Sequence, residues 1–246
     1  MTAGGIAELL GVFVEDMRLL EHARSRLARE VLLSGVERPL DAKTLSRQIR
    51  AQSQRVRGDF EAAARKLGLP HSFRFARGEG YAELVLHSTG TETLVITAAT
   101  SGAARAAWQP TLDTLLSASL RRLLFAREGW QTGRTVLALV EDPSDMALSV
   151  ARRIAEQSQS PIALILFGAA AADPKALRGV IDDADTPKAR ASIAAVETEI
   201  GPATLVASVK RTSARLVIIP WKLAAGDPEL IGALLNQTNS SVLLLK

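Results

Sequence analysis

The sequence predicts an α/β protein in which mainly parallel strands are flanked by helices. Two observations lead to this fold class. The strongest apolar runs are short and do not alternate with polar residues, as in strands buried on both faces of a parallel sheet. Patterns typical of helices lie between most of these runs, which is the strand–helix–strand order of a parallel sheet. The 246 residues are 47% hydrophobic and 23% charged, so the chain can build one large core or two small ones.

Six apolar runs are the predicted strands. Each is rich in Leu, Val, Ile or Ala and is too short to be an independent helix. In chain order they are residues 9–14, 93–98, 135–140, 162–167, 216–219 and 242–245.

A long helix is predicted over residues 41–67. Asp41 is its expected N-cap, and Gly68 lies just past its end, two residues before Pro70. Apolar residues recur at helical spacing along it: Leu45, Ile49, Val56, Phe60, Ala63 and Leu67. Its other face is basic, with Arg47, Arg50, Arg55, Arg57 and Lys66. That face is either an anion or nucleic-acid surface or a solvated flank, and we favour the flank.

An internal repeat divides the chain into two related halves, residues 1–131 and 132–246. Gly80-Tyr-Ala-Glu-Leu-Val followed by Thr93-Leu-Val-Ile in the first half matches Gly201-Pro-Ala-Thr-Leu-Val followed by Arg215-Leu-Val-Ile in the second. The boundary is expected in the polar, glycine-containing stretch 128–134. Two copies of one fold are the simplest explanation.

Composition narrows the functional classes. The chain has no cysteine, which excludes disulfides and thiolate metal sites and is typical of a reducing compartment. No apolar run reaches the ~18 residues of a membrane span, and residues 1–11 do not resemble a secretory signal, so we expect a cytoplasmic protein. The net charge is only +4 and aromatic residues are 4%, so we do not expect nucleic-acid binding.

Several segments resemble the tandem universal stress proteins of bacteria. The first half carries Leu10-Gly-Val-Phe-Val-Glu-Asp-Met-Arg-Leu-Leu20, a long helix and then Phe73-Arg-Phe-Ala-Arg-Gly78. The second half carries Val136-Leu-Ala-Leu-Val-Glu-Asp-Pro-Ser-Asp145 and closes on Ser241-Val-Leu-Leu-Leu-Lys246. The resemblance implies two flavodoxin-like layered units, the first starting at what looks like the family's second strand and so missing its leading strand. It also implies that the short terminal strand pairs edge to edge, either between the halves or between two chains.

The resemblance further implies where a nucleotide would bind. ATP-binding members place an Asp after the first strand and a Gly-x-x-Gly loop after the fourth, whose backbone N–H groups hold phosphates. Asp142 and Ser144 match the first position and would contact the base or ribose. Residues 219–228, after the fourth strand, contain one glycine and an acid, so the phosphate loop is missing. The first half offers Gly102 and Arg105, which would complete a composite site with Asp142.

Each candidate residue also has a simpler explanation. Residues 142–145 are predicted mainly as a turn in which Ser144 or Asp145 caps the helix that follows. His22, His71 and His87 are far apart in sequence and not paired with carboxylates at ligand spacing, so no metal site is expected. The sequence contains no recognisable nucleophile or phosphate-binding motif.

The favoured hypothesis is therefore a non-catalytic regulatory or interaction protein of the universal stress type. It would need no cofactor and would act on a protein partner or as a homodimer. The alternative is a small-molecule or adenine-nucleotide sensor whose diverged pocket at the strand ends, near Asp142, takes ATP or AMP with Arg105 or Lys222 facing the anion. A nucleotide hydrolase on the same scaffold is a third and weaker hypothesis.

Overall fold

The computed structural model divides the chain into two compact units, residues 1–89 and 90–246. It describes residues 8–25, 27–31, 34–78, 83, 93–97, 115, 120–127, 134–142, 144–172, 191–197 and 199–246. The expected boundary between the repeated halves, residues 128–134, lies outside the described ranges except for Arg134, so the division at 131/132 stays a prediction.

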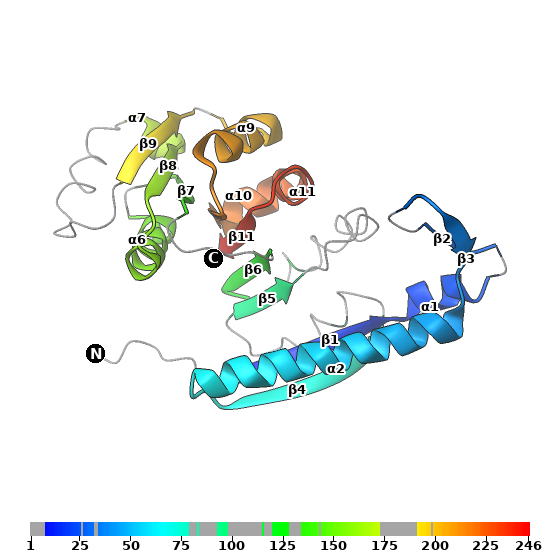
Figure 1. Cartoon of the computed structure of the whole chain (residues 1–246). Helices are drawn as coiled ribbons and strands as arrows, with labels where there is room; N and C mark the ends of the chain where they lie inside the picture. The colour runs from blue at the N-terminus through cyan, green and yellow to red at the C-terminus, as the bar shows by residue number, and fades with distance from the viewer. Residues whose placement is uncertain are drawn as a thin grey trace. The chain divides into compact units, whose positions relative to one another are not determined.

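The first unit contains two small sheets and one long helix (Figure 1). Strands β1 and β4 pair in parallel over eight residues, from Leu9 opposite His71 to Asp16 opposite Gly78. Strands β2 and β3 form a separate antiparallel hairpin. The elements are β1 (Leu9–Asp16), α1 (Met17–Ala23), β2 (Arg29–Val31), β3 (Glu37–Pro39), α2 (Ala42–Lys66) and β4 (His71–Gly78).

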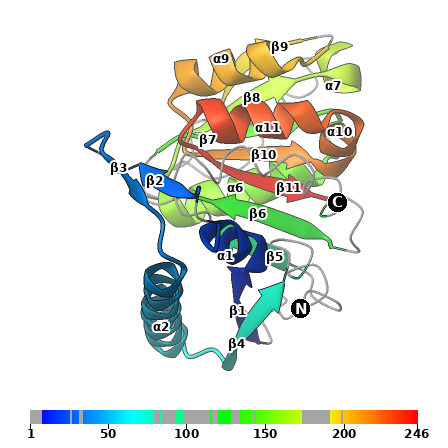
Figure 2. The same ribbon diagram turned by 90° about the vertical axis from the view of Figure 1, so that its right-hand side faces the viewer.

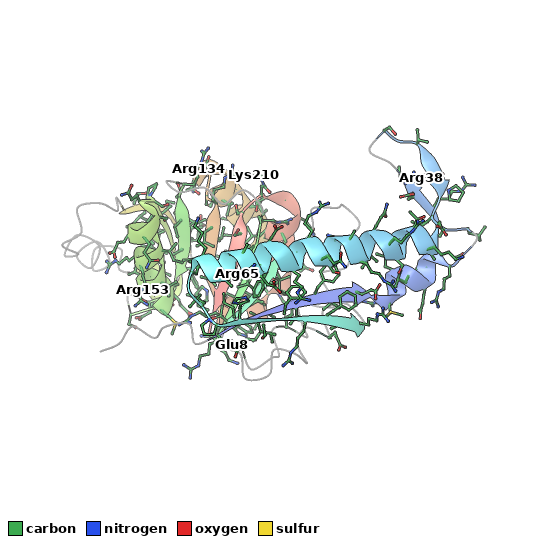
Figure 3. The ribbon with its side chains drawn as sticks, turned by 60° about the horizontal axis from the view of Figure 1, so that its bottom comes forward. Glu8, Arg38, Arg65, Arg134, Arg153 and Lys210 are labelled. Atoms are coloured by element: carbon green, nitrogen blue, oxygen red, sulfur yellow. The ribbon has the colours of Figure 1, made fainter. Side chains whose placement is uncertain are left out.

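Helix α2 begins and ends at the residues that the sequence predicts. Asp41 is its N-cap and accepts hydrogen bonds from the amides of Lys43 and Thr44. Gly68, just past the end, has φ +66°, a conformation that glycine adopts without strain. The helix lies along β1 and β4 (Figure 3), with the Phe60 ring 5.8 Å from that of Phe73. The predicted helix over 41–67 is therefore confirmed.

The second unit is a seven-stranded sheet with helices on both faces. Its helices are α6 (Met146–Ser158), α7 (Gly168–Ala172), α9 (Pro202–Thr212), α10 (Trp221–Gly226) and α11 (Pro228–Gln237). Its strands are β5 (Thr93–Thr97), β6 (Arg122–Ala126), β7 (Val136–Val140), β8 (Ile162–Leu166), β9 (Ala191–Val196), β10 (Leu216–Pro220) and β11 (Ser241–Leu245).

The strand order of this sheet is β5-β6-β11-β10-β7-β8-β9. All neighbours are parallel except β11 and β6, which run antiparallel from Val242 opposite Phe125 to Leu245 opposite Arg122. The chain moves from β7 outward to β9 and then returns to β10 on the other side of β7. The reversal places a topological switch point between β7 and β10. All six predicted strands are present, so the mainly parallel α/β fold is confirmed.

The pairing of β11 answers one question that the sequence left open. This C-terminal strand lies between β10 and β6, so both of its edges are hydrogen-bonded within the same chain. The expected edge pairing of the terminal strand therefore occurs inside the chain. The homodimer stays a prediction, and β11 offers it no free edge.

Helices α9 and α11 contact each other in front of the sheet in Figure 2, and α6 lies behind it. Every residue of β7, β8, β10 and β11 is buried, as the unbroken apolar runs predict. The core between α6 and the sheet includes Val136, Leu164 and Ile218, packed against Ala147 and Ala151. Within the described residues, no helix has the length and hydrophobicity needed to span a membrane.

Candidate functional site

The carboxyl ends of β7 and β10 are where an open parallel sheet with this strand order binds ligands. Strand β7 ends at Val140 and is followed by Glu141 and Asp142, whereas β10 ends at Pro220 and is followed by Trp221 and Lys222. The site predicted from Asp142 and Ser144 therefore lies beside the switch point of the sheet.

Asp142 and Ser144 form a turn that is closed by the carboxylate. Asp142 Oδ1 accepts hydrogen bonds from the Ser144 amide at 2.8 Å and from the Ser144 hydroxyl at 2.6 Å. These two bonds, with the hydroxyl contributing most, hold the pKa of the Asp142 carboxyl below its usual range. Both residues are exposed. The carboxylate is ionised and open to solvent, but one of its oxygens is already engaged within the turn.

Asp145 caps helix α6, which confirms the structural role predicted for this turn. Its side chain accepts a hydrogen bond from the Ala147 amide at 3.0 Å and a second from the Glu141 amide at 3.3 Å. The second bond ties the end of β7 to the start of α6. The aspartate at the helix N-terminus also interacts favourably with the helix dipole.

Glu141 and Lys222 form an ion pair across the switch point. Lys222 Nζ lies 3.6 Å from Glu141 Oε1, and the Lys222 side chain is 85% exposed. An added Cβ on Gly168, the first residue of α7, would lie 3.1 Å from Glu141 Cγ, so the Glu141 side chain also packs closely against α7. Lys222, which the sensor hypothesis directs toward an anion, thus has a carboxylate partner within the protein.

The segment after β10 is helical instead of a glycine loop. It forms α10, and Asp227 then caps α11 by accepting a hydrogen bond from the Glu229 amide at 3.1 Å. Gly226 does not have the positive φ that glycines adopt in phosphate loops. Trp221 is only 6% exposed, and Lys246 Nζ lies 5.7 Å from the centre of its ring. An aspartate and a buried indole therefore occupy the segment where the resemblance implies a glycine loop in ATP-binding members.

The remaining candidates are only partly described. Gly102 and Arg105 lie outside the described residues, so a composite site with Asp142 stays a prediction. His22 Nδ1 lies 2.7 Å from the Arg18 carbonyl oxygen, and His71 Nδ1 lies 3.0 Å from that of Leu69. His87 is outside the described ranges. Within the described ranges, no three side chains of the kinds that bind metals come together.

Two residues of this site were missed from the sequence alone. Glu141 stands next to Asp142, but its pairing with Lys222 depends on β7 and β10 being neighbours in the sheet. Gly168 looks like an ordinary small residue at the end of a strand. Its φ of +56° shows that it makes a turn there.

Comparisons with solved structures support the fold and go no further than the fold. A universal stress protein from Archaeoglobus fulgidus DSM 4304 has a TM-score of 0.60 at 11% identity, covering 96% of this chain and 96% of that one. A functionally unknown protein from Pseudomonas aeruginosa PAO1 has a TM-score of 0.55 at 13% identity, covering 98% of this chain and 92% of that one. A candidate universal stress protein from Pseudomonas aeruginosa UCBPP-PA14 has a TM-score of 0.52 at 14% identity, covering 98% and 93%.

No protein-family model matches the sequence, and a search of the curated proteins gives no match. The chain is thus similar in fold to universal stress proteins, which agrees with the resemblance seen in its motifs.

Proposed function

We propose that the chain is a non-catalytic regulatory or interaction protein of the universal stress type that does not hold ATP as the family's ATP binders do. The observation that carries the proposal is the helical segment after β10. A phosphate cradle needs several backbone N–H groups that converge on one point and are free to donate. In this segment the Asp227 amide already donates to the Leu223 carbonyl oxygen at 3.1 Å, and the Asp227 side chain would repel a phosphate.

The carboxylates near the switch point support a structural role over catalysis. Asp142 holds Ser144, Asp145 caps α6, and Glu141 is paired with Lys222. A general base has to reach the proton that it removes and keep an appropriate pKa. The pKa of Asp142 is lowered, away from the value a base near neutral pH requires. The nucleotide hydrolase is therefore the weakest of the three hypotheses.

A small-molecule or adenine-nucleotide sensor is the second candidate. The observation in its favour is that Asp142 is exposed and ionised at the carboxyl end of β7, where the resemblance places an adenine or ribose contact. ATP or AMP would be its ligand, and Gly102 and Arg105 would contribute from the first half of the chain.

Under the favoured proposal the protein acts through protein contacts, with a homodimer as the simplest assembly, in the cytoplasm. Because β11 is paired on both edges, a dimer would use another surface. Strands β5 and β9 end the order of the seven-stranded sheet and are the edges to examine.

The test is a thermal-shift titration with ATP and with AMP on the wild type and on Asp142→Ala. We expect any change that ATP or AMP causes in the melting temperature to be the same in Asp142→Ala as in the wild type, because the Asp142 carboxylate binds Ser144 within its own turn. Glu199→Ala is the matched control, since Glu199 is an exposed carboxylate that makes no hydrogen bond or ion pair with the described residues. Stabilisation by ATP or AMP that Asp142→Ala abolishes and Glu199→Ala retains would establish the sensor instead.

A further inference from the structure

A basic pocket lies between α1 and α2 in the first unit. Its volume is about 580 Å³, within the ~300–1,000 Å³ typical of small-molecule sites. Leu20 and Arg24 line it from α1 and the turn that follows, and Lys43, Ser46, Arg47 and Arg50 line it from the first half of α2. None of these residues belongs to the turn of Asp142.

Four cationic side chains line this pocket, and no acidic side chain does. Lys43, Arg47 and Arg50 are spaced by four and three residues, so they share one face of α2. Arg24 adds a fourth positive charge from a separate element. Charges of one sign gathered in a concave surface concentrate the electrostatic potential there. An anion is the ligand that such a surface attracts.

Three of the four cations are available to a ligand. Within the described residues, the side chains of Arg24, Lys43 and Arg50 make no hydrogen bond or ion pair, and all three residues are exposed. Arg47 differs, because its Nη2 donates to Thr44 Oγ1 at 3.2 Å. The pKa of Asp41 is lowered mainly by hydrogen bonds from Thr44 and Lys43, and the nearby charge of Arg47 adds a smaller contribution. Asp41 therefore offsets part of the Arg47 charge, whereas no acidic side chain lines the pocket beside the other three cations.

We propose that this pocket binds a small polyanion that carries two or more phosphate groups. Arginine guanidinium groups bind phosphate oxygens in pairs, and lysine adds a point charge. The pocket is large enough for a di- or triphosphate group. None of its lining residues is aromatic, so it has no platform on which nucleic-acid bases would stack. The chemistry recognised is thus the phosphates, and Leu20 supplies an apolar wall for the rest of the ligand.

The test is calorimetric titration of the full chain with sodium tripolyphosphate, which contains no adenine and so tests this pocket independently of Asp142. Arg24→Gln/Arg50→Gln removes two of the unpaired charges from two elements. Arg55→Gln/Arg74→Gln is the matched control, because both arginines are exposed and lie outside the pocket lining. This double substitution lowers the net charge by the same amount as the pocket variant. We expect one site in the wild type, a dissociation constant raised at least ~10-fold in the pocket variant, and a change of less than ~2-fold in the control.

Three results would overturn the proposal. The first is no binding of tripolyphosphate to the wild type at low salt. The second is equal weakening in the pocket and control variants, which would indicate attraction by the net charge alone. The third is tighter binding of a 20-nucleotide single strand that both variants weaken alike, which would indicate a nucleic-acid surface spread over α2 and β4.

Discussion

At the scale of single residues, Asp142 shows how one carboxylate fits both a structural and a ligand-binding explanation. The resemblance to universal stress proteins implies that Asp142, after β7, would contact an adenine or ribose, yet its hydrogen bonds go to Ser144, two residues along the chain. Aspartate commonly closes turns in this way without any ligand. A test of function at this residue must therefore separate the turn from the ligand.

The pKa of Asp142, measured without ligand, reports on the turn alone. The Ser144 hydroxyl and amide bind the ionised carboxylate, so they lower the pKa in the folded state relative to the unfolded state. A lowered pKa in an acid means that its contribution to stability is present above the ordinary value, near 4, and is lost as the pH falls through the folded value. We expect Ser144→Ala to raise the pKa of Asp142 toward its usual range, with the amide bond preserving part of the shift.

The measurement is a ¹³C NMR titration of the Asp142 carboxyl between pH 2 and 7. Ser149→Ala is the control, because Ser149 Oγ donates to the Met146 carbonyl oxygen on the neighbouring helix and does not touch Asp142. An Asp142 pKa that is the same in wild type and Ser144→Ala would contradict the hydrogen bond as its cause.

The residues of the candidate site were predictable only where the signal is local. Asp145 stands directly before a helical pattern, so its role as a cap can be read from the sequence. The pairing of Glu141 with Lys222 cannot be read from the sequence, because it requires β7 and β10 to be neighbours. The order of the strands depends on the whole sheet. Arg24 was missed for the same reason, since only the fold brings it to the basic face of α2.

At the scale of elements, helices and strands were predictable where their signals lie within or beside the element itself. Helix α2 was predicted almost to the residue, because Asp41, Gly68 and the apolar spacing all lie within it or beside it. Strands β6 and β9 were missed. The leucines of β6 follow Leu116 and Leu120 at helical spacing, so they read as the continuation of a helix, and β9 is half alanine, so it does not stand out as a strongly apolar run. The β2–β3 hairpin is too short and too exposed to leave a pattern.

Helix α2 carries a prediction about its own stability. Gly58 lies within it, and an added Cβ there would meet only open space. Alanine has less conformational freedom to lose and favours the helix, so Gly58→Ala should raise the free energy of unfolding by about 0.5–1 kcal/mol. Gly68→Ala should lower it by about 1 kcal/mol, because φ +66° is strained for alanine.

Urea unfolding followed by circular dichroism at 222 nm measures both substitutions on the same scale. The two glycines act as controls for each other, since the added methyl group is identical and only the backbone conformation differs. Destabilisation by Gly58→Ala would mean that the exposed side of α2 at this position is covered by something absent from the described contacts.

At the scale of the whole molecule, the presence of a parallel sheet was predictable, but the set of strands that form it was not. The strand–helix order of the second half requires parallel neighbours, and these are present from β10 through β9. The addition of β5 and β6 through the antiparallel β6–β11 pair brings together strands far apart in sequence. No local pattern specifies such a pair, because its energy comes from long-range hydrogen bonds and burial.

The two units should differ in local stability. In the second unit, β7 and β10 are completely buried in the centre of a seven-stranded sheet. In the first, β1 pairs only with β4 among the described strands, and most residues of these two strands are half-buried or exposed. A two-stranded sheet is marginal without further packing, and here the packing that the unit itself supplies comes mainly from α2. We therefore expect amides of β7 and β10 to exchange at least ~10-fold more slowly than those of β1 and β4.

Hydrogen–deuterium exchange with mass spectrometry on the full chain measures this difference. Peptides covering β6 and β11 are the internal reference, because their antiparallel pair lies within the same sheet as β10 and should share its protection. If β1 and β4 exchanged as slowly as β10, the first unit would have to be stabilised by contacts beyond its own described residues. If the difference holds, the seven-stranded sheet is the stable framework, and the unit carrying the basic pocket is the part whose stability a bound polyanion would raise most.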